Sequence, residues 1–237
     1  MGNAIKPHIK NAERTGVLQV ENTGLTEFPR EVFQLVNVLR TLDISNNKIG
    51  NLPPSIGNFT HLKHLTASHI RLTTLPDELG SLKKLESVNF SLNSLTFLPE
   101  SFQELVNLRT LNLSNNKFSE LPAVFSKMKR LELLDMSHNE LVAVPDHVRD
   151  VSAIEINLNQ NQISSLSEAI AECSKLKVLR LEENCLQLSA IPEKILTDSQ
   201  ISLLAIEGNL FESKDLHSRE GWEKYMERFT ATKKKLY

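Results

Sequence analysis

Four side chains near the middle of the chain have the types that a nucleophilic hydrolase uses. They are Ser114, Asp135, Ser137 and His138. A serine nucleophile needs its base within about 2.6–3.2 Å, a third group that orients the base, and donors for an oxyanion. These residues occupy surface positions in adjacent copies of a sequence repeat, which instead predicts an open and solvated surface. We therefore expect no hydrolase site and no enzyme activity.

The residue types that bind metals and cofactors also lack suitable partners. His64 and His69 lie close in sequence, but no second pair of His, Cys or carboxylate residues stands at zinc-ligand spacing. Neither a G-x-x-x-x-G-K-[ST] loop nor a G-x-G-x-x-G turn occurs. The two cysteines, Cys173 and Cys185, are interpreted as free thiols of a reducing compartment. The sequence predicts no metal and no cofactor.

A repeat of the pattern L-x-x-L-x-L-x-x-N-x-L extends along most of the chain, with a period of 23 residues. Clear copies start at Leu39, Leu85, Leu108, Leu131 and Leu176, and weaker copies start at Leu62, Ala153 and Ile201, after a degenerate first copy around Leu18. We count offsets from the first Leu of each copy, which is offset 0. Side chains at offsets 3 and 5 share one face of a short strand, so each coil buries its neighbour. The Asn at offset 8 can satisfy backbone groups of the turn. Ile70 takes its place in the third coil, where we expect a less regular turn.

An apolar residue and a proline close many of the units. These pairs are Leu52-Pro53, Leu75-Pro76, Leu98-Pro99, Leu121-Pro122 and Val144-Pro145. Proline ends regular strand pairing, and the spaced apolar residues after it predict a short helix or 3₁₀ turn. Roughly 200 of the 237 residues thus resemble the leucine-rich repeat superfamily, in its short intracellular class. The resemblance implies an α/β solenoid, a curved horseshoe with a parallel concave sheet and short helices or 3₁₀ turns on the convex side.

The two ends of the chain depart from the repeat. Residues 218–231 carry Trp222, Tyr225, Met226 and Phe229 at helical spacing. This pattern predicts an amphipathic helix that caps the last coil, because a terminal repeat would otherwise expose an apolar face. The alternative is that the aromatic stripe, with the basic residues 233–235, docks on a partner or an anionic membrane.

The N-terminus carries a partial lipidation signal. Removal of Met1 would expose Gly2, the acceptor of a myristoyl group, although Lys6 stands where the usual pattern has Ser or Thr. Lys6, Lys10 and Arg14 could add the second membrane signal that one acyl chain requires. The alternative is a frayed arm. The predicted organisation is an arm at residues 1–14, nine repeats at 15–217, and a cap helix with a basic tail at 218–237.

The N-terminus, the nine repeats and the ending E-K-Y-M-E-R-F-T-A-T-K-K-K together resemble the leucine-rich repeat-containing protein 57 family over the whole chain. That resemblance implies a small, repeat-only protein with a lipid anchor on Gly2 and no established enzymatic role.

Side chains at offsets 2, 4, 6 and 7 are expected to point outward from the concave sheet, where a partner would lie. A column of serines at offset 6 would make the middle of this face small and hydrogen-bonding, and its C-terminal third is more acidic. A basic or mixed-charge peptide could bind there. The candidate partner-binding residues are Asp43, His64, Asn89, Asn112, Asp135, Asn157, Arg180, Glu182, Glu183 and Glu207.

Composition narrows the function further. The net charge of −2, from 27 basic and 29 acidic side chains, excludes a general attraction to nucleic acid. No apolar run is long enough for a signal peptide or a membrane span. We expect a cytoplasmic, monomeric, non-catalytic scaffold for an unidentified protein partner, with a lipid anchor on Gly2 as an additional hypothesis. The alternative is a membrane-targeted regulator that acts through Gly2, Lys6, Lys10 and the C-terminal lysines.

Overall fold

The computed structural model describes the backbone of residues 2–233 and the side chains of residues 5–232. The chain divides into two compact units, Met1–Lys117 (unit 1) and Phe118–Tyr237 (unit 2). Each unit is a stack of repeat coils. Lys234 and Lys235, which belong to the predicted basic tail, lie outside the described residues.

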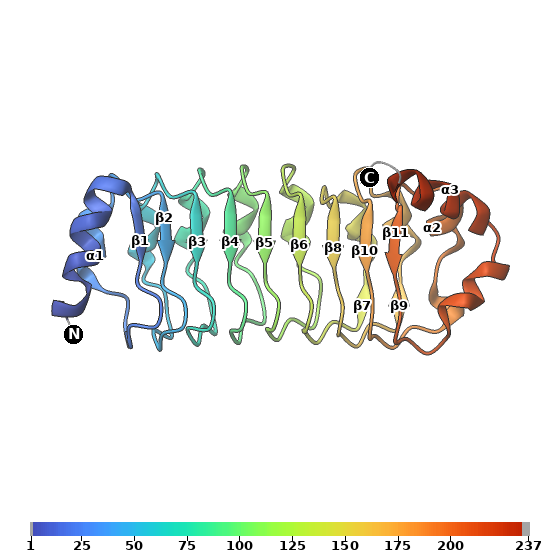
Figure 1. Cartoon of the computed structure of the whole chain (residues 1–237), viewed down its shortest axis with the longest axis horizontal. Helices are drawn as coiled ribbons and strands as arrows, with labels where there is room; N and C mark the ends of the chain where they lie inside the picture. The colour runs from blue at the N-terminus through green and yellow to red at the C-terminus, as the bar shows by residue number, and fades with distance from the viewer. Residues whose placement is uncertain (1, 234–237) are drawn as a thin grey trace. The chain divides into compact units, whose positions relative to one another are not determined.

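In its described residues, unit 1 contains one α-helix and a parallel sheet in which strand order follows chain order (Figure 1). Its elements are α1 (Gly2–Thr15), β1 (Val17–Gln19), β2 (Thr41–Asp43), β3 (His64–Thr66), β4 (Ser87–Asn89) and β5 (Thr110–Asn112). Neighbouring strands pair in register at repeat-equivalent positions, for example Leu42 with Leu65. The middle residue of each strand is buried and its two neighbours point outward. We call the surface formed by the outward side chains the strand face of the unit.

Unit 2 continues the pattern with its own parallel strands in the order β6-β8-β10-β11, and with a second pair, β7-β9. Its elements are β6 (Leu133–Asp135), β7 (Ala143–Val144), β8 (Glu155–Asn157), β9 (Ser165–Leu166), β10 (Val178–Arg180), α2 (Glu193–Thr197), β11 (Leu203–Ala205) and α3 (Trp222–Lys233). The parallel sheets and the short helices confirm the leucine-rich repeat fold that the pattern predicts.

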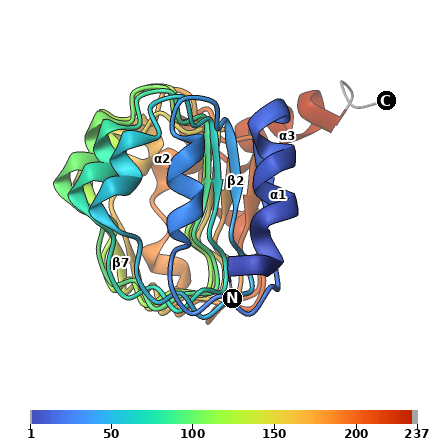
Figure 2. The ribbon, with the colours of Figure 1, turned by 90° about the vertical axis from the view of Figure 1, so that its left-hand side faces the viewer.

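Short 3₁₀ helices return the chain on the side opposite the strands, as Figure 2 shows for unit 1. They span Arg30–Leu35, Pro54–Asn58, Asp77–Ser81, Glu100–Glu104, Ala123–Lys127, Asp146–Asp150, Glu168–Glu172, Leu188–Ala190 and Ser213–Ser218. Prolines of the closing pairs, such as Pro53 and Pro76, stand at the N-cap with extended backbone. A proline there fixes φ without losing a helical donor, so these helices begin where the sequence predicts them.

A column of buried asparagines holds successive turns together. Asn116, for example, donates from Nδ2 to the carbonyls of Phe90 (3.0 Å) and Leu113 (3.0 Å) and accepts from the Leu95 N–H (3.0 Å). Each such amide therefore satisfies backbone groups of its own coil and of the preceding coil.

Ile70 interrupts this column, as expected. Its side chain is buried, and the side-chain carbonyl of Asn93 in the next coil accepts from its N–H at 3.2 Å. Both His69 and Arg71, on either side of it, adopt left-handed φ values of +54° and +69°. The turn that contains Asn116 has one such residue, Asn115, so the third coil turns less regularly than that coil.

The N-terminal segment differs from the frayed arm considered above. It forms α1, which packs on the first coil by burying Ile5, Ile9 and Ala12 (Figure 1). Gly16 ends the helix with φ +69°, and a Cβ there would meet the Val38 carbonyl oxygen at 2.7 Å, so a side chain is excluded. The spacing of Ile5, Ile9 and Ala12 is the signal that could have predicted this helix.

Candidate partner-binding surface

The Asp and Asn side chains of the predicted site that lie at offset 4 share a structural task. In unit 1, Asp43, Asn89 and Asn112 each accept a backbone N–H from two residues further along the chain, at 2.9 Å. In unit 2, Asp135 and Asn157 do the same. This local bond stabilises the end of each strand. These five residues are only half-buried, so one side of each remains available at the surface.

The serine column at offset 6 is largely inside the protein, which corrects the expectation of a polar outer face. Ser45, Ser91, Ser114 and Ser137 are all buried. Ser68 and Ser91 share a hydrogen bond of 2.9 Å between their hydroxyls. A serine is small enough for the chain to turn inward at this position, so the column belongs to the turn and offers little surface.

The outward positions of unit 2 form three rows across the strands. Strand register places Leu133, Glu155, Val178 and Leu203 in one row and Asp135, Asn157, Arg180 and Ala205 in the next. A third row follows the strands and contains Asn159, Glu182 and Glu207. The structure thus brings Asp135, Asn157, Arg180, Glu182, Glu183 and Glu207 together on unit 2. Asp43, His64, Asn89 and Asn112 lie on the strand face of unit 1.

Charged groups on unit 2 are compensated unevenly. Arg180 Nε donates to Glu155 Oε1 at 2.8 Å, so the single cation of the predicted site is already paired. Glu182 and Glu183 accept instead from the side-chain amides of Asn159 (2.5 Å) and Gln160 (2.8 Å). Because amides are neutral, these bonds orient the carboxylates and leave their charge in place.

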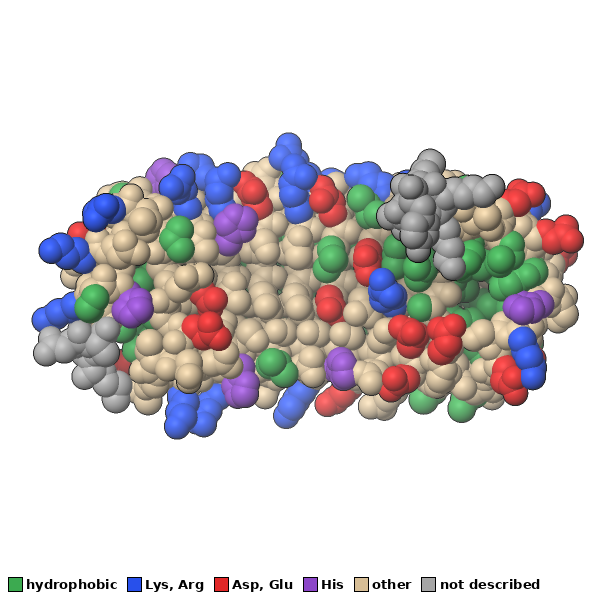
Figure 3. Space-filling model, in the orientation of Figure 1, with side chains coloured by type: hydrophobic (Ala, Val, Ile, Leu, Met, Phe, Trp, Pro, Cys, Tyr) green, Lys and Arg blue, Asp and Glu red, His purple; other side chains and the backbone are tan. Residues whose placement is uncertain are grey.

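Sequence reasoning missed the apolar part of this surface. Val178 and Leu203 are half-buried neighbours on the strand face, where unit 1 has His64 and Ser87 at the equivalent position. Figure 3 shows hydrophobic side chains gathered over α3 and the adjoining strands, with acidic side chains beside them. The apolar residues at offset 2 in β10 and β11, where β2 to β5 have Thr, His, Ser and Thr, are the signal that could have found it.

A hollow opens where α3 meets the last coil. It measures about 200 Å³ and is lined by Leu204, Ile206, Glu207, Ser213, Leu216, His217, Trp222, Tyr225, Met226 and Phe229. Trp222 lies against His217 (ring centroids 4.5 Å apart) and against Tyr225 (5.4 Å). We call this space the cap hollow. It includes all four residues of the aromatic stripe, so the stripe both covers the last coil and borders a cavity.

The outer edge of β11 is closed to further strands. The Tyr225 hydroxyl accepts from the Leu204 N–H at 3.1 Å, and the Glu207 carboxylate accepts from the Ile206 N–H at 3.1 Å. Burial raises the pKa of the Tyr225 phenol, so it stays a neutral acceptor at physiological pH. Side chains thus occupy donors that a partner strand would use.

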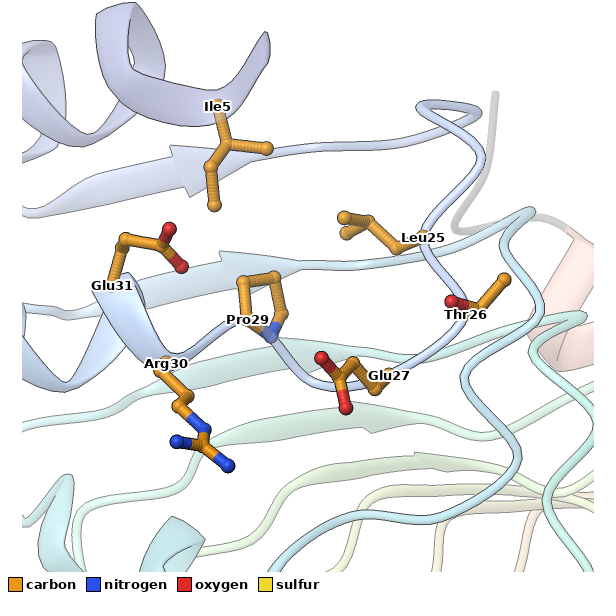
Figure 4. A pocket seen from close by; sticks show the side chains of 7 residues that line it. All are labelled: Ile5, Leu25, Thr26, Glu27, Pro29, Arg30 and Glu31. Carbon is orange, nitrogen blue, oxygen red and sulfur yellow. The ribbon is translucent and has the colours of Figure 1, made fainter. Parts of the chain in front are cut away.

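A second hollow of about 180 Å³ lies in unit 1, between α1 and the segment that follows the first turn (Figure 4). Ile5, Leu25 and Pro29 supply its apolar lining, and Glu27, Arg30 and Glu31 supply charged groups. Ligand pockets usually measure about 300–1,000 Å³, so this gap is too small for an ordinary ligand.

The residues considered for catalysis and metal binding occupy repeat positions. Ser137 Oγ donates to Asp135 Oδ1 at 2.7 Å within one coil, while His138 is exposed at a left-handed φ of +54°. His64 and His69 are both exposed on unit 1. Within residues 2–233, no group of three or more His, Cys, Asp or Glu side chains could hold a metal ion. In the same range, no helix is both long and apolar enough for a transmembrane span.

Comparison with known proteins agrees with the repeat. Residues 8–94 match the family described as leucine-rich repeat region, and residues 99–141 match leucine rich repeat. The chain is 37% identical over 51 residues to plant intracellular Ras-group-related LRR protein 7 of Oryza sativa subsp. japonica, which covers 22% of this chain and 20% of that relative.

Two solved structures show the same architecture. The LRR protein LIC12759 of Leptospira interrogans has a TM-score of 0.74 and 28% identity, over 87% of this chain and 60% of that one. The plant peptide hormone receptor RGFR1 in complex with RGF2 has a TM-score of 0.68 and 25% identity, over 81% of this chain and 32% of that one. This chain therefore spans less than two thirds of each relative. The repeat spacing, the stacked parallel strands and these matches make the chain a member of the leucine-rich repeat superfamily.

Proposed function

We propose that the protein is a non-catalytic interaction scaffold that binds a protein partner on its strand face, with the main contact on unit 2. The observation that carries this proposal is that half-buried apolar side chains, Val178 and Leu203, share the strand face of unit 2 with the uncompensated carboxylates of Glu182 and Glu183. Apolar surface supplies binding free energy, and charge supplies specificity and a faster encounter.

Two further facts support this function. The strand face of unit 2 carries both apolar and charged side chains, as protein interfaces do. A similar solved structure, that of RGFR1, is of a receptor in complex with RGF2, so a fold of this kind can carry a bound partner. The proposed location is the cytoplasm, and the proposed assembly is a monomer.

Charge reversal tests the proposal directly. Replacing both Glu182 and Glu183 with Lys should abolish capture of partners that the wild-type chain retains from cell lysate. The free energy of unfolding, measured by thermal denaturation, should change by less than about 0.5 kcal/mol, because the two side chains lie at the surface. Glu140→Lys, an exposed carboxylate of unit 2 with no place in the three rows, is the matched control. Equal capture by the double variant and the wild type would exclude this face as the main contact.

A membrane-targeted role is the second candidate, and the geometry of α1 favours it. Lys6, Lys10 and Arg14 recur every four residues on the exposed side of α1, while Ile5 and Ile9 are buried against the first coil. A helix held in this way presents a basic stripe close to Gly2. Myristoylation of Gly2 together with that stripe would give the two signals that stable membrane residence requires.

Intact mass and fractionation test this second role. Myristoylation would increase the mass of the native N-terminus by one acyl group, and Gly2→Ala should then move the chain from membranes to the soluble fraction. Replacing Lys6 and Lys10 with Gln should weaken membrane binding while the acyl group remains, because each basic residue near an anionic surface contributes about 1 kcal/mol. An unmodified N-terminus, with the same partners bound by the wild type and by Gly2→Ala, would exclude the lipid anchor. The scaffold function without an anchor would then remain.

A further inference from the structure

The cap hollow lies at the end of the strand face of unit 2, beside its carboxylates (Figure 3). We infer that this hollow anchors one large apolar side chain of an extended partner segment, and that a Lys or Arg of the same segment contacts Glu183 and Glu207. The inference rests on the proposed scaffold function and specifies the chemistry of the partner.

The size of the hollow selects a side chain over a free ligand. Its volume of about 200 Å³ equals the space of about seven water molecules at about 30 Å³ each. Small-molecule sites usually start at about 300 Å³. A Leu, Met or Phe side chain fits this space, and burying one contributes about 1.5–3 kcal/mol. Aromatic and methionine linings of this kind are typical of the central pockets of protein interfaces.

The charged residues around the hollow favour a Lys or Arg next to the anchor side chain in the partner segment. Glu207 lines the hollow, and the Glu183 N–H donates to the Glu207 carbonyl at 2.8 Å, so the two residues are adjacent. Glu207 accepts from the Ile206 N–H and from the Ser213 hydroxyl, and Glu183 accepts from Gln160. All of these donors are neutral.

Two nearby cations are already engaged. Arg180 pairs with Glu155, and Lys214 pairs with Glu212. His217, which also lines the hollow, lies against the Trp222 ring. The carboxylates of Glu183 and Glu207 therefore form a negative rim that a Lys or Arg of the partner would complete, and an acidic segment would be repelled.

The edge of β11 argues for docking through side chains rather than through the backbone. The Leu204 and Ile206 N–H groups are bonded to Tyr225 and Glu207, so a partner strand would have to displace both. An anchor side chain entering the hollow from the strand face requires no such displacement.

Trp222 gives a direct readout, because it is the only tryptophan of the chain and it lines the hollow. Random dodecapeptides displayed on phage would be selected against the full chain, and the enriched peptides synthesised and titrated. We expect enrichment of a large apolar residue with Lys or Arg within a few positions. Binding should shift Trp222 emission to shorter wavelength, because an apolar side chain replaces water beside the indole.

Matched variants separate the two parts of the site. Met226→Arg fills the hollow with a cation and should weaken the selected peptides at least about tenfold, which corresponds to about 1.4 kcal/mol. Ala231→Arg, on an exposed position of the same helix, should leave affinity unchanged. Glu183→Gln with Glu207→Gln keeps the hydrogen-bond acceptors and removes the charge, so it should weaken binding about tenfold at low salt and less at high salt. Glu140→Gln is its control.

The outcomes distinguish this inference from the proposed function. One outcome is that peptides bind without changing Trp222 emission and lose affinity with Val178→Asp but not with Met226→Arg. This outcome would exclude the cap hollow as the anchor site and would still support binding on the strand face. Enrichment of acidic peptides would overturn the charge assignment. Selected peptides that bind every strand-face and hollow variant like the wild type would count against both proposals. The emission shift is measured on the wild-type chain, so it holds even if Met226→Arg fails to fold.

Discussion

Asn116 illustrates how one side chain ties two coils together. It donates to one carbonyl of its own coil and one of the preceding coil, and it accepts from an N–H of the preceding coil; the residues that supply these groups are buried. An unpaired buried N–H costs about 1–3 kcal/mol, and the loss of Asn116 would leave the Leu95 N–H without its acceptor.

Asn116→Ala should therefore lower the free energy of unfolding by about 1–3 kcal/mol. Urea denaturation followed by circular dichroism measures this. Asn11→Ala is the control, because Asn11 is exposed on α1 and the change should stay within about 0.5 kcal/mol. Equal effects at the two positions would contradict a structural role for the asparagine column.

The two cysteine thiols differ in burial and therefore in reactivity. Cys173 is buried and donates to the Val148 carbonyl, and burial raises its pKa from 9.0 to about 12. Cys185 is exposed. The thiolate is the reactive species. Cys173 is therefore protected from thiol reagents both by its burial and by its raised pKa, which keeps it protonated.

A thiol reagent at pH 8 should modify one cysteine of the native chain, Cys185, and both after denaturation. The raised pKa also has a consequence for stability. The contribution of the buried thiol is fully present below pH 9, and it is lost as the pH rises from 9 toward 12. Peptide mapping after alkylation identifies the modified residue, and rapid native labelling of Cys173 would contradict its burial.

At the scale of elements, α3 holds the last coil through polar contacts as well as apolar ones. Arg228 donates to the carbonyls of Ile195 (3.0 Å), Leu196 (2.8 Å) and Ile201 (3.0 Å), and Tyr225 closes the β11 edge. These carbonyls lie at or after the end of α2, where a cation also interacts favourably with the helix dipole.

Tyr225→Phe should cost about 1–3 kcal/mol, because it leaves the buried Leu204 N–H without its acceptor while the ring is retained. Trp222 fluorescence during urea unfolding reports on this region directly. Thr230→Ala, at an exposed position of α3, should change stability by less than about 0.5 kcal/mol. No loss in Tyr225→Phe would mean that water replaces the hydroxyl at this edge.

At the scale of the whole molecule, a repeat protein is soluble only if its terminal coils are covered. α1 covers the first coil of unit 1 by burying Ile5, Ile9 and Ala12. The 3₁₀ helix Ser213–Ser218 and α3 cover the last coil of unit 2, where Leu216 and Tyr225 are buried.

A chain that ends before Trp222 should therefore self-associate, because it uncovers the β11 edge and the apolar side chains beneath α3. Size-exclusion chromatography with light scattering measures the mass. A chain that ends at Lys233 keeps α3 and should behave as the full chain does. A monodisperse, fully folded product from the shorter truncation would show that α3 is dispensable as a cap.

The sequence by itself determines the coils. Each repeat position has the same local environment in every coil. The spacing of the repeat therefore predicts the strands, the turn asparagines such as Asn116, and the prolines at which the 3₁₀ helices begin. Tertiary structure decided what the surface offers, because exposure depends on how neighbouring coils pack. It buried Ser114 and paired Arg180 with Glu155 of the preceding coil. The cap hollow also belongs to tertiary structure, because three segments separate in the sequence meet to form it.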